Sequence, residues 1–239
     1  MAARYDNRKA DELRPVKFTR NYIEHAEGSV LVEFGGTRVV CTATVEQGVP
    51  TWLKGAGKGW ITAEYAMLPR STGQRSKRES YGRPSGRSLE IGRLIGRSLR
   101  SVTKLDKLGE RTVTIDCDVL TADGGTRTAA VTGGWLALHD ALVWLGGGEE
   151  TGALPITDHV AAVSVGVVAG NELLDLCYRE DVAADVDANV VMTGAGNLIE
   201  VQATAEGQLY DRACLDRLLD LATQGINELV ELQRKVLQG

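Results

Sequence analysis

Two successive groups of strands, each followed by a helix, constrain the fold of this chain most strongly. In the first group, residues 29–34 alternate apolar and polar side chains, Gly35 and Gly36 mark a turn, and residues 37–45 form a β-branched run. This pattern predicts a β-hairpin. Further strands are predicted over residues 59–67, 112–121, 160–168, 172–178, 188–193 and 198–205.

Helical periodicity separates the strand groups. Apolar side chains repeat every three or four positions over residues 89–105, 128–145 and 211–237. Three glycines at 146–148 and Pro155 divide the chain into halves of about 13–148 and 155–239. Because each half carries strands and then a helix, we expect an α+β fold of duplicated halves within one domain, 1–239. The two sheets should share a layer of helices.

The composition favours a soluble, intracellular protein. Of 239 residues 43% are hydrophobic, no run of eighteen apolar residues occurs, and residues 1–14 are polar where a secretory signal would be apolar. We therefore expect a cytoplasmic location and no membrane partner. Four widely spaced cysteines without a C-x-x-C pair predict reduced, buried thiols at Cys41, Cys117, Cys177 and Cys214. The chain has three histidines, His25, His139 and His159, and their spacing is not that of metal ligands. We therefore expect neither a zinc centre nor a histidine-based triad.

The net charge of −5 conceals a strongly basic segment. Residues 70–104 contain ten basic and two acidic side chains, a local charge of +8, so the remainder carries −13. This asymmetry predicts a polyanionic partner such as RNA or DNA. Within the segment, residues 71–86 are rich in Gly, Ser, Arg and Lys and lack apolar periodicity, which predicts an exposed basic loop.

The helix after this loop is also basic. Its charged side chains recur every three or four residues and predict one basic face, made of Arg93, Arg97, Arg100 and Lys104. A solvated helix face without any function would show the same spacing. The adjacent loop favours nucleic-acid binding, and the candidate contacts are Arg70, Arg75, Arg78, Arg93 and Arg97.

The hexapeptide Asp-Gly-Gly-Thr-Arg-Thr, residues 123–128, joins a predicted strand to a predicted helix. Glycines allow the backbone to approach a ligand, and the first amides of a helix are unpaired donors. Thr126 adds a hydroxyl group and Arg127 a guanidinium fork. The segment therefore predicts a pocket for a phosphate-sized anion, with a tight turn capped by Thr126 as the alternative.

A second chemical candidate is the acidic cluster at residues 180–187. Asp181 and Asp187 are six residues apart, and a bend between strands could bring both carboxylates to one Mg²⁺ or Mn²⁺ ion. Acidic residues are also common in ordinary turns. Asp116 and Asp118 share one face of a predicted strand and form a weaker metal candidate.

Sequence patterns of several other enzyme classes are absent. The chain has no G-x-x-x-x-G-K-[ST] loop and no G-x-S-x-G turn. Gly194-Ala195-Gly196 precedes a strand rather than a helix, which is the wrong context for dinucleotide binding. NTP-hydrolysing and redox enzymes are therefore disfavoured.

Seven short segments together resemble the bacterial ribonuclease PH family, over nearly the whole chain. They are Leu13-Arg14-Pro15-Val16, His25-Ala26-Glu27-Gly28-Ser29, Gly59-Trp60-Ile61-Thr62-Ala63-Glu64-Tyr65, Met67-Leu68-Pro69-Arg70-Ser71-Thr72, Asp116-Cys117-Asp118-Val119-Leu120, residues 123–128 and Asn189-Val190-Val191-Met192-Thr193. Each segment is weak alone, but their order and spacing are specific. Residues 73–84 resemble the family only in their basic character.

The resemblance implies a phosphorolytic 3′-to-5′ exoribonuclease, or tRNA nucleotidyltransferase. Such an enzyme trims tRNA precursors and other RNA 3′ ends, including those of rRNA, with inorganic phosphate and releases nucleoside diphosphates reversibly. It also implies the duplicated βαβα fold of a ribosomal-protein domain and a homohexamer of three dimers. The family's phosphate site corresponds to Arg87, Gly125, Thr126 and Arg127, and its catalytic pair, which would work with Mg²⁺, to Asp181 and Asp187.

Two alternatives of other classes can be compared with this one. A catalytically inert RNA-binding ring subunit would lack Arg127 or one of Asp181 and Asp187, whereas this chain has all three. A small-molecule kinase of similar topology would need a glycine-rich triphosphate loop, which is absent. The sequence therefore favours the exoribonuclease.

Overall fold

The computed structural model describes residues 4–79, 84–147 and 154–238, and these contain nine strands and four α-helices. The strands of the first half are β1 (Val16–Arg20), β2 (Gly28–Phe34), β3 (Thr37–Gln47), β4 (Trp60–Met67) and β5 (Arg111–Thr121). Those of the second half are β6 (Val160–Val168), β7 (Asn171–Leu174), β8 (Val186–Thr193) and β9 (Leu198–Ala205). The helices are α1 (Gly86–Ser101), α2 (Thr126–Leu145), α3 (Tyr178–Val182) and α4 (Arg212–Gln238).

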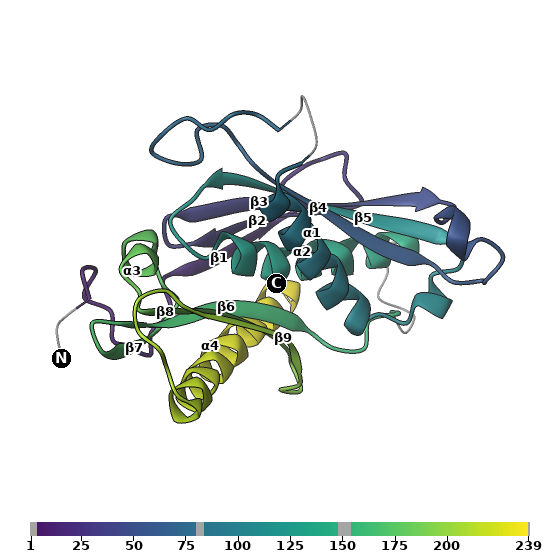
Figure 1. Cartoon of the computed structure of the whole chain (residues 1–239). Coiled ribbons are helices and arrows are strands. Elements are labelled where there is room, and N and C mark those ends of the chain that lie inside the picture. The colour runs from purple at the N-terminus through teal and green to yellow at the C-terminus, as the bar shows by residue number, and fades with distance from the viewer. Residues whose placement is uncertain (1–3, 80–83, 148–153, 239) are drawn as a thin grey trace.

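These elements form four layers, in the order sheet, helix pair, sheet and helix (Figure 1). The first sheet has the strand order β1-β2-β3-β5-β4 and the second β7-β6-β8-β9. Helices α1 and α2 lie between the sheets, and α4 packs against β6, β7 and β8. The predicted α+β fold, with two sheets and helices between and against them, is confirmed.

Helix α2 is buried on nearly all sides because both sheets pack against it. Apart from Arg127, His139 and Asp140, its side chains are apolar or small around the whole circumference rather than along one stripe. A Cβ atom at Gly133 would lie 2.1 Å from Val32 Cγ2 on β2, so only glycine permits this close approach. The packing fixes the start of α2, which carries Thr126 and Arg127, relative to both sheets.

The two faces of β8 serve different layers. Met192 Sδ accepts a hydrogen bond of 3.7 Å from Thr223 Oγ1 of α4. Side chains alternate along a strand, so Asp187, five residues earlier, lies on the opposite face, toward α1 and α2. Gln202 pairs with Asn189 in the register of β9 and shares that inner face.

The strand predicted over residues 172–178 is wrong beyond Leu174. Asp175 adopts a left-handed conformation with φ of 53°, which ends β7. Tyr178 then begins the short helix α3, where the Glu180 side chain accepts the backbone N–H of Cys177 at 3.0 Å. The sequence prediction therefore missed a helix that carries Asp181.

Three smaller predictions also need correction. The basic helix ends at Ser101, so Lys104 is not part of its face. Gly125, with φ of 65°, occupies the position before α2, so Thr126 is the first helical residue and not its cap. Strand β1 was not predicted, because its sequence Val-Lys-Phe-Thr-Arg alternates only briefly.

The predicted thiols are confirmed: all four cysteines are free and buried. Within the described parts of the chain, no helix is long and apolar enough to cross a membrane.

Candidate active site

The turn before α2 consists of two successive left-handed glycines. Gly124 and Gly125 have φ of 76° and 65°. No protein acceptor is present, among the described residues, for the backbone N–H groups of Gly125, Thr126 and Arg127. These amides, at the positive end of a 20-residue helix, provide the donors that an anion requires.

Thr126 and Arg127 are held from several elements. The Thr126 hydroxyl is buried and lies 2.8 Å from the hydroxyl of Tyr65 on β4. Arg127 Nη1 is 3.2 Å from Glu90 Oε1 on α1 and also donates to Gln202 Oε1 on β9. The guanidinium group therefore lies where α1, α2 and β9 meet.

Arg87 reaches the same place from the first turn of α1. Ser85 caps this helix, accepting the backbone N–H of Ser88 at 3.1 Å. Burial raises the pKa of Tyr65, and its hydrogen bond with Thr126 and the charges of Arg87 and Arg127 oppose that rise. The structure thus brings the two predicted phosphate-binding arginines around one spot.

Asp181 and Asp187 face these arginines from α3 and β8. Partial burial raises the pKa of Asp181, and the charges of Arg87 and Arg127 oppose that rise. Burial, and next the charge of Asp181, raises the pKa of Asp187 to about 6. The charges of both arginines therefore affect the pKa of each carboxyl group, and the charge of Asp181 also affects that of Asp187. All four charged groups form one cluster.

The carboxylate pair suits a Mg²⁺ or Mn²⁺ ion that is completed by substrate. Asp187 Oδ1 is buried without a hydrogen-bond partner among the described residues, and such an orphaned oxygen is available as a ligand. The described residues contain no group of three or more His, Cys, Asp or Glu side chains arranged to hold a metal. Mg²⁺ commonly uses one or two carboxylates together with water and substrate phosphates, and this pair fits that pattern.

Asp116 and Asp118, the weaker metal candidates, lie elsewhere. They alternate on β5 with the buried residues Ile115 and Cys117, whose side chains face α2. The two aspartates therefore project from the opposite face of the first sheet, away from Asp181 and Asp187.

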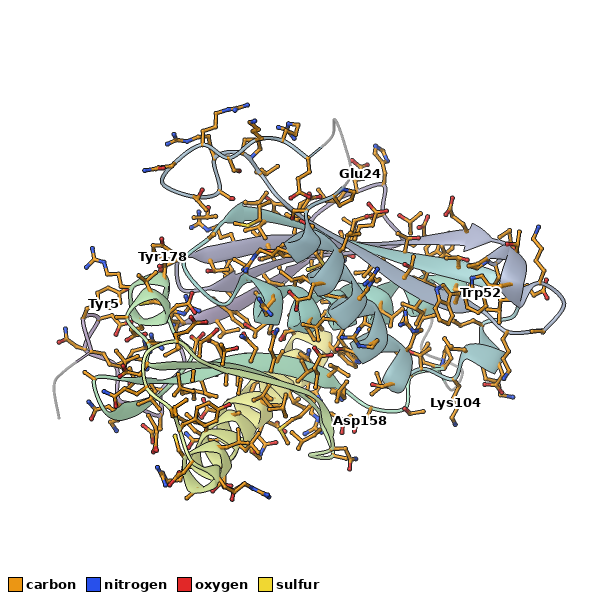
Figure 2. The ribbon with its side chains drawn as sticks, viewed as in Figure 1. Tyr5, Glu24, Trp52, Lys104, Asp158 and Tyr178 are labelled. Atoms are coloured by element: carbon orange, nitrogen blue, oxygen red, sulfur yellow. The ribbon has the colours of Figure 1, made fainter. Side chains whose placement is uncertain are left out.

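The basic segment has two different parts. The loop between β4 and α1 exposes Arg70, Arg75 and Arg78. Figure 2 shows the basic side chains of this loop, with blue nitrogen atoms at their ends, above the first sheet. On α1, Arg93 is exposed, but Arg97 pairs with Glu200 at 2.6 Å.

Arg100 is also engaged within the protein. Its guanidinium carbon lies 4.4 Å from the ring centroid of Trp60, and its Nη1 donates to the carbonyl of Ile61 at 2.7 Å. Arg93, Arg97 and Arg100 thus share the less buried side of α1, but two of them also bind neighbouring elements, and Lys104 lies beyond the helix.

Sequence reasoning missed four side chains of this cluster as site residues: Tyr65, Glu90, Gln202 and Glu206. The charge of Glu206, which follows β9, raises the pKa of both Asp181 and Asp187. Only Tyr65 had a signal, since it belongs to a segment that resembles the ribonuclease PH family. The other three come from separate elements, and only the tertiary fold brings them to Arg127 or the aspartates.

Models of one protein family and a known relative match most of the amino-acid sequence. Residues 12–143 match the first domain of the 3′ exoribonuclease family and residues 158–225 its second domain. The chain is 60% identical over 232 residues to the ribonuclease PH of Methylocella silvestris, a match that covers 97% of this chain and 98% of the relative.

Solved structures agree on the fold. A chain of the Archaeoglobus fulgidus exosome with RNA bound to the active site has a TM-score of 0.82 at 27% identity, covering 96% of this chain and 92% of its own length. An archaeal exosome core chain has a TM-score of 0.77 at 26% identity, covering 97% and 91%. Rice Rrp46, at 21% identity with a TM-score of 0.80 over 99% of this chain and all of its own, shares the fold. The chain belongs to the ribonuclease PH family of 3′ exoribonucleases.

Proposed function

We propose that Gly125, Thr126, Arg127 and Arg87 bind inorganic phosphate and that Asp181 and Asp187 are the catalytic carboxylates. The chain is a phosphorolytic 3′-to-5′ exoribonuclease that removes terminal nucleotides from tRNA precursors. One observation carries the site assignment: the charges of Arg87 and Arg127 both act on the carboxylate pair, and Arg127 belongs to the first turn of α2, whose amides have no protein acceptor among the described residues. Two anions, phosphate and the RNA end, can be brought together only where cations offset their repulsion.

Phosphorolysis requires an in-line displacement. An oxygen of phosphate forms a bond to the phosphorus of the last phosphodiester, and the bond to the 3′-oxygen of the shortened strand breaks. The products are a nucleoside 5′-diphosphate and an RNA shorter by one nucleotide. Since phosphate is already an anion at neutral pH, the protein mainly has to hold it and stabilise the spreading negative charge.

The residues divide this work by their chemistry. Arg127 and Arg87 stay charged and can bind phosphate oxygens bidentately, while the amides of residues 125–127 and the Thr126 hydroxyl donate further bonds. Asp187, with a pKa of about 6, is suited to carry a proton to the leaving 3′-oxygen. Asp181 and Asp187 would alternatively hold Mg²⁺ (or Mn²⁺), which would neutralise charge on the scissile phosphate.

One assay tests the reaction class. The protein is incubated with Mg²⁺ and a tRNA bearing extra 3′ nucleotides, with and without phosphate. We expect nucleoside diphosphates only with phosphate. Monophosphates would indicate hydrolysis instead, and no release would indicate the inert subunit.

The site assignment predicts the effect of Arg127→Ala. Removing an anchoring cation should lower phosphate-dependent trimming by about 10²-fold or more, because the stabilisation is lost in the transition state. Binding of tRNA, measured by filter retention, should change little. Arg38→Ala is the matched control, since Arg38 is exposed on β3 and, among the described residues, its ion pair is with Glu33 at 3.0 Å. Normal trimming by Arg127→Ala would overturn the assignment.

We also propose how the chain is organised and where it acts. It is one domain, 1–239, with halves of about 13–148 and 155–239, and its larger hydrophobic cluster contains residues of both sheets. It assembles as a homohexamer of three dimers in the cytoplasm and binds RNA backbone through Arg70, Arg75, Arg78 and Arg93, with Arg97 released from Glu200. The mass in solution, by light scattering, tests the hexamer.

A further inference from the structure

A short N-terminal segment, residues 4–15, packs three arginines against the second half of the chain. Arg4, Arg8 and Arg14 have side chains that are at most 7% exposed, and they converge on Asp175 and Glu180. Burial of so many charges is costly unless each is paired with good geometry. The segment is called the arginine arm below.

Arg14 links Asp175 to the turn before α2. Its Nε and Nη2 donate to the two carboxylate oxygens of Asp175 at 2.9 and 2.7 Å. Its Nη1 donates to the carbonyl oxygen of Asp123 at 2.5 Å, and Nη2 lies 3.4 Å from that of Gly124. One guanidinium group thus binds both a carboxylate and two consecutive backbone carbonyls.

Thr37, the first residue of β3, holds the same turn through its fully buried side chain. Its hydroxyl donates to the Gly124 carbonyl at 2.6 Å and accepts the backbone N–H of Asp123 at 2.9 Å. Arg14 and Thr37 together bind the carbonyl groups of both peptides that precede Gly125.

This clamp sets the direction of the turn's donors. In a trans peptide the C=O and the following N–H point in opposite directions. When the carbonyls of Asp123 and Gly124 point toward Arg14 and Thr37, the N–H groups of Gly124 and Gly125 must point away from them. Both glycines adopt a left-handed φ, which this path of the backbone requires. A Cβ atom at Gly125 would also lie 3.0 Å from Arg14 Nη2.

The same arm also holds the helix that carries Asp181. Arg4 binds both carboxylate oxygens of Glu180 on α3 at 2.7 Å and donates to the carbonyl of Leu174 at 2.9 Å. Tyr5 lies beside this helix in Figure 2, with the guanidinium carbon of Arg179 at 5.2 Å from its ring centroid. The arm is therefore in contact with both the anion turn and the helix that carries Asp181.

We propose that Arg14 and Thr37 are positioning residues for the phosphate pocket, holding the Asp123–Gly125 turn so that its amides face the bound anion. The inference rests on the proposed phosphate site. A purely structural clamp would change stability when it is weakened but would leave the affinity of the folded enzyme for phosphate unchanged.

The test uses two conservative pairs of variants. Arg14→Lys keeps the charge beside Asp175 but lacks the planar fork that binds both Asp175 oxygens and the two carbonyls at once, and Thr37→Val replaces the hydroxyl by a methyl group of similar size. Arg8→Lys is the control for Arg14, because Arg8 donates to the Asp175 carbonyl at 3.2 Å and has no described contact with the turn. Thr37→Ser is the control for Thr37→Val, because it keeps the hydroxyl and should retain wild-type affinity for phosphate.

Two readouts are measured at saturating tRNA. We expect the KM for phosphate to rise on the order of tenfold in Arg14→Lys and in Thr37→Val, with kcat changed less, because displaced donors bind the anion less well. The upward Tm shift caused by added phosphate should shrink in parallel, and this readout needs no catalysis. Arg8→Lys and Thr37→Ser should behave as the wild type.

The outcomes separate this inference from the proposed function. If wild-type trimming does not depend on phosphate, the proposed function fails. If it does, but folded Arg14→Lys and Thr37→Val keep the wild-type KM and Tm shift for phosphate, the clamp is only structural. An equal rise in Arg8→Lys would also overturn the inference, since the effect would then be general. Should one variant not fold, the other decides.

Discussion

Asp187, which we propose as a catalytic carboxylate, makes the stability of the fold depend on pH. Burial and the neighbouring Asp181 raise its pKa to about 6. The unfolded chain has the ordinary, lower pKa, so the folded state binds the proton more tightly. The resulting stabilisation is complete below the unfolded pKa and is lost as pH rises through about 6.

This linkage predicts that Asp187→Asn abolishes trimming yet stabilises the fold at high pH. In metal-free buffer at about pH 8 we expect a gain of about 1–2 kcal/mol in the free energy of unfolding, since one pKa unit is worth about 1.4 kcal/mol and the group is only partly buried. The gain should shrink as pH falls through about 6 and vanish near pH 3, below the ordinary pKa of an unfolded aspartate, where the Asp187 carboxyl is protonated in both states. Denaturant unfolding at both pH values measures it.

Asp220→Asn, on the exposed face of α4, is the control and should show neither effect. A gain for Asp187→Asn that is the same at both pH values would show that its charge is not the cause.

At the scale of elements, α2 is held by close approach to the first sheet. A Cβ at Gly133 would meet Val32 Cγ2 at 2.1 Å, whereas one at Gly134 would have its nearest neighbour, Ile115 Cγ2, at 3.4 Å. Adjacent positions of one helix therefore differ in available space and share the same propensity gain from alanine.

We predict opposite results for the two alanine substitutions. Gly133→Ala should lower the free energy of unfolding by about 1–3 kcal/mol because the helix has to move off β2. Gly134→Ala should be neutral or stabilising by up to about 1 kcal/mol. Equal destabilisation of both in urea would mean that α2 does not pack on β2 as described.

Local patterns predicted most elements because alternation and helical periodicity depend on neighbours in sequence. Helix α3 was not predicted, because contacts between distant residues determine it. Asp175, in a left-handed conformation, ends β7, and Arg4 binds the Glu180 side chain. The hexapeptide at 123–128 could be predicted as an anion turn from local sequence, because its glycines, the helix that follows, Thr126 and Arg127 are neighbours along the chain, although a tight capped turn was the alternative. Its partners Tyr65, Glu90 and Gln202 could not be predicted, because they come from β4, α1 and β9, which meet only in three dimensions.

On the scale of the whole molecule, charge is separated between the basic loop and an acidic remainder. Replacing Arg70, Arg75 and Arg78 together by Ala should reduce the slope of log K against log salt for tRNA binding by about 2, because each phosphate contact contributes roughly 0.7–0.9. Fluorescence titrations at several salt concentrations measure the slope.

The matched control removes the same charge from α4, through Arg212, Arg217 and Arg234, which are exposed on the far layer. Its slope should remain that of the wild type. Equal slopes for both triple variants would exclude the loop from the RNA interface.

The order of the elements along the chain also has a consequence during synthesis. The cluster draws on Arg87 and Arg127 from the first half, Asp181 and Asp187 from the second, and Gln202 from β9. The sheet that carries Asp187 is covered on its other face by α4, which ends at Gln238. Translation runs from the N-terminus, so β9 and α4 have to leave the ribosome before these groups can meet on a covered sheet. A nascent chain therefore cannot assemble the proposed site until its last strand and last helix have been made.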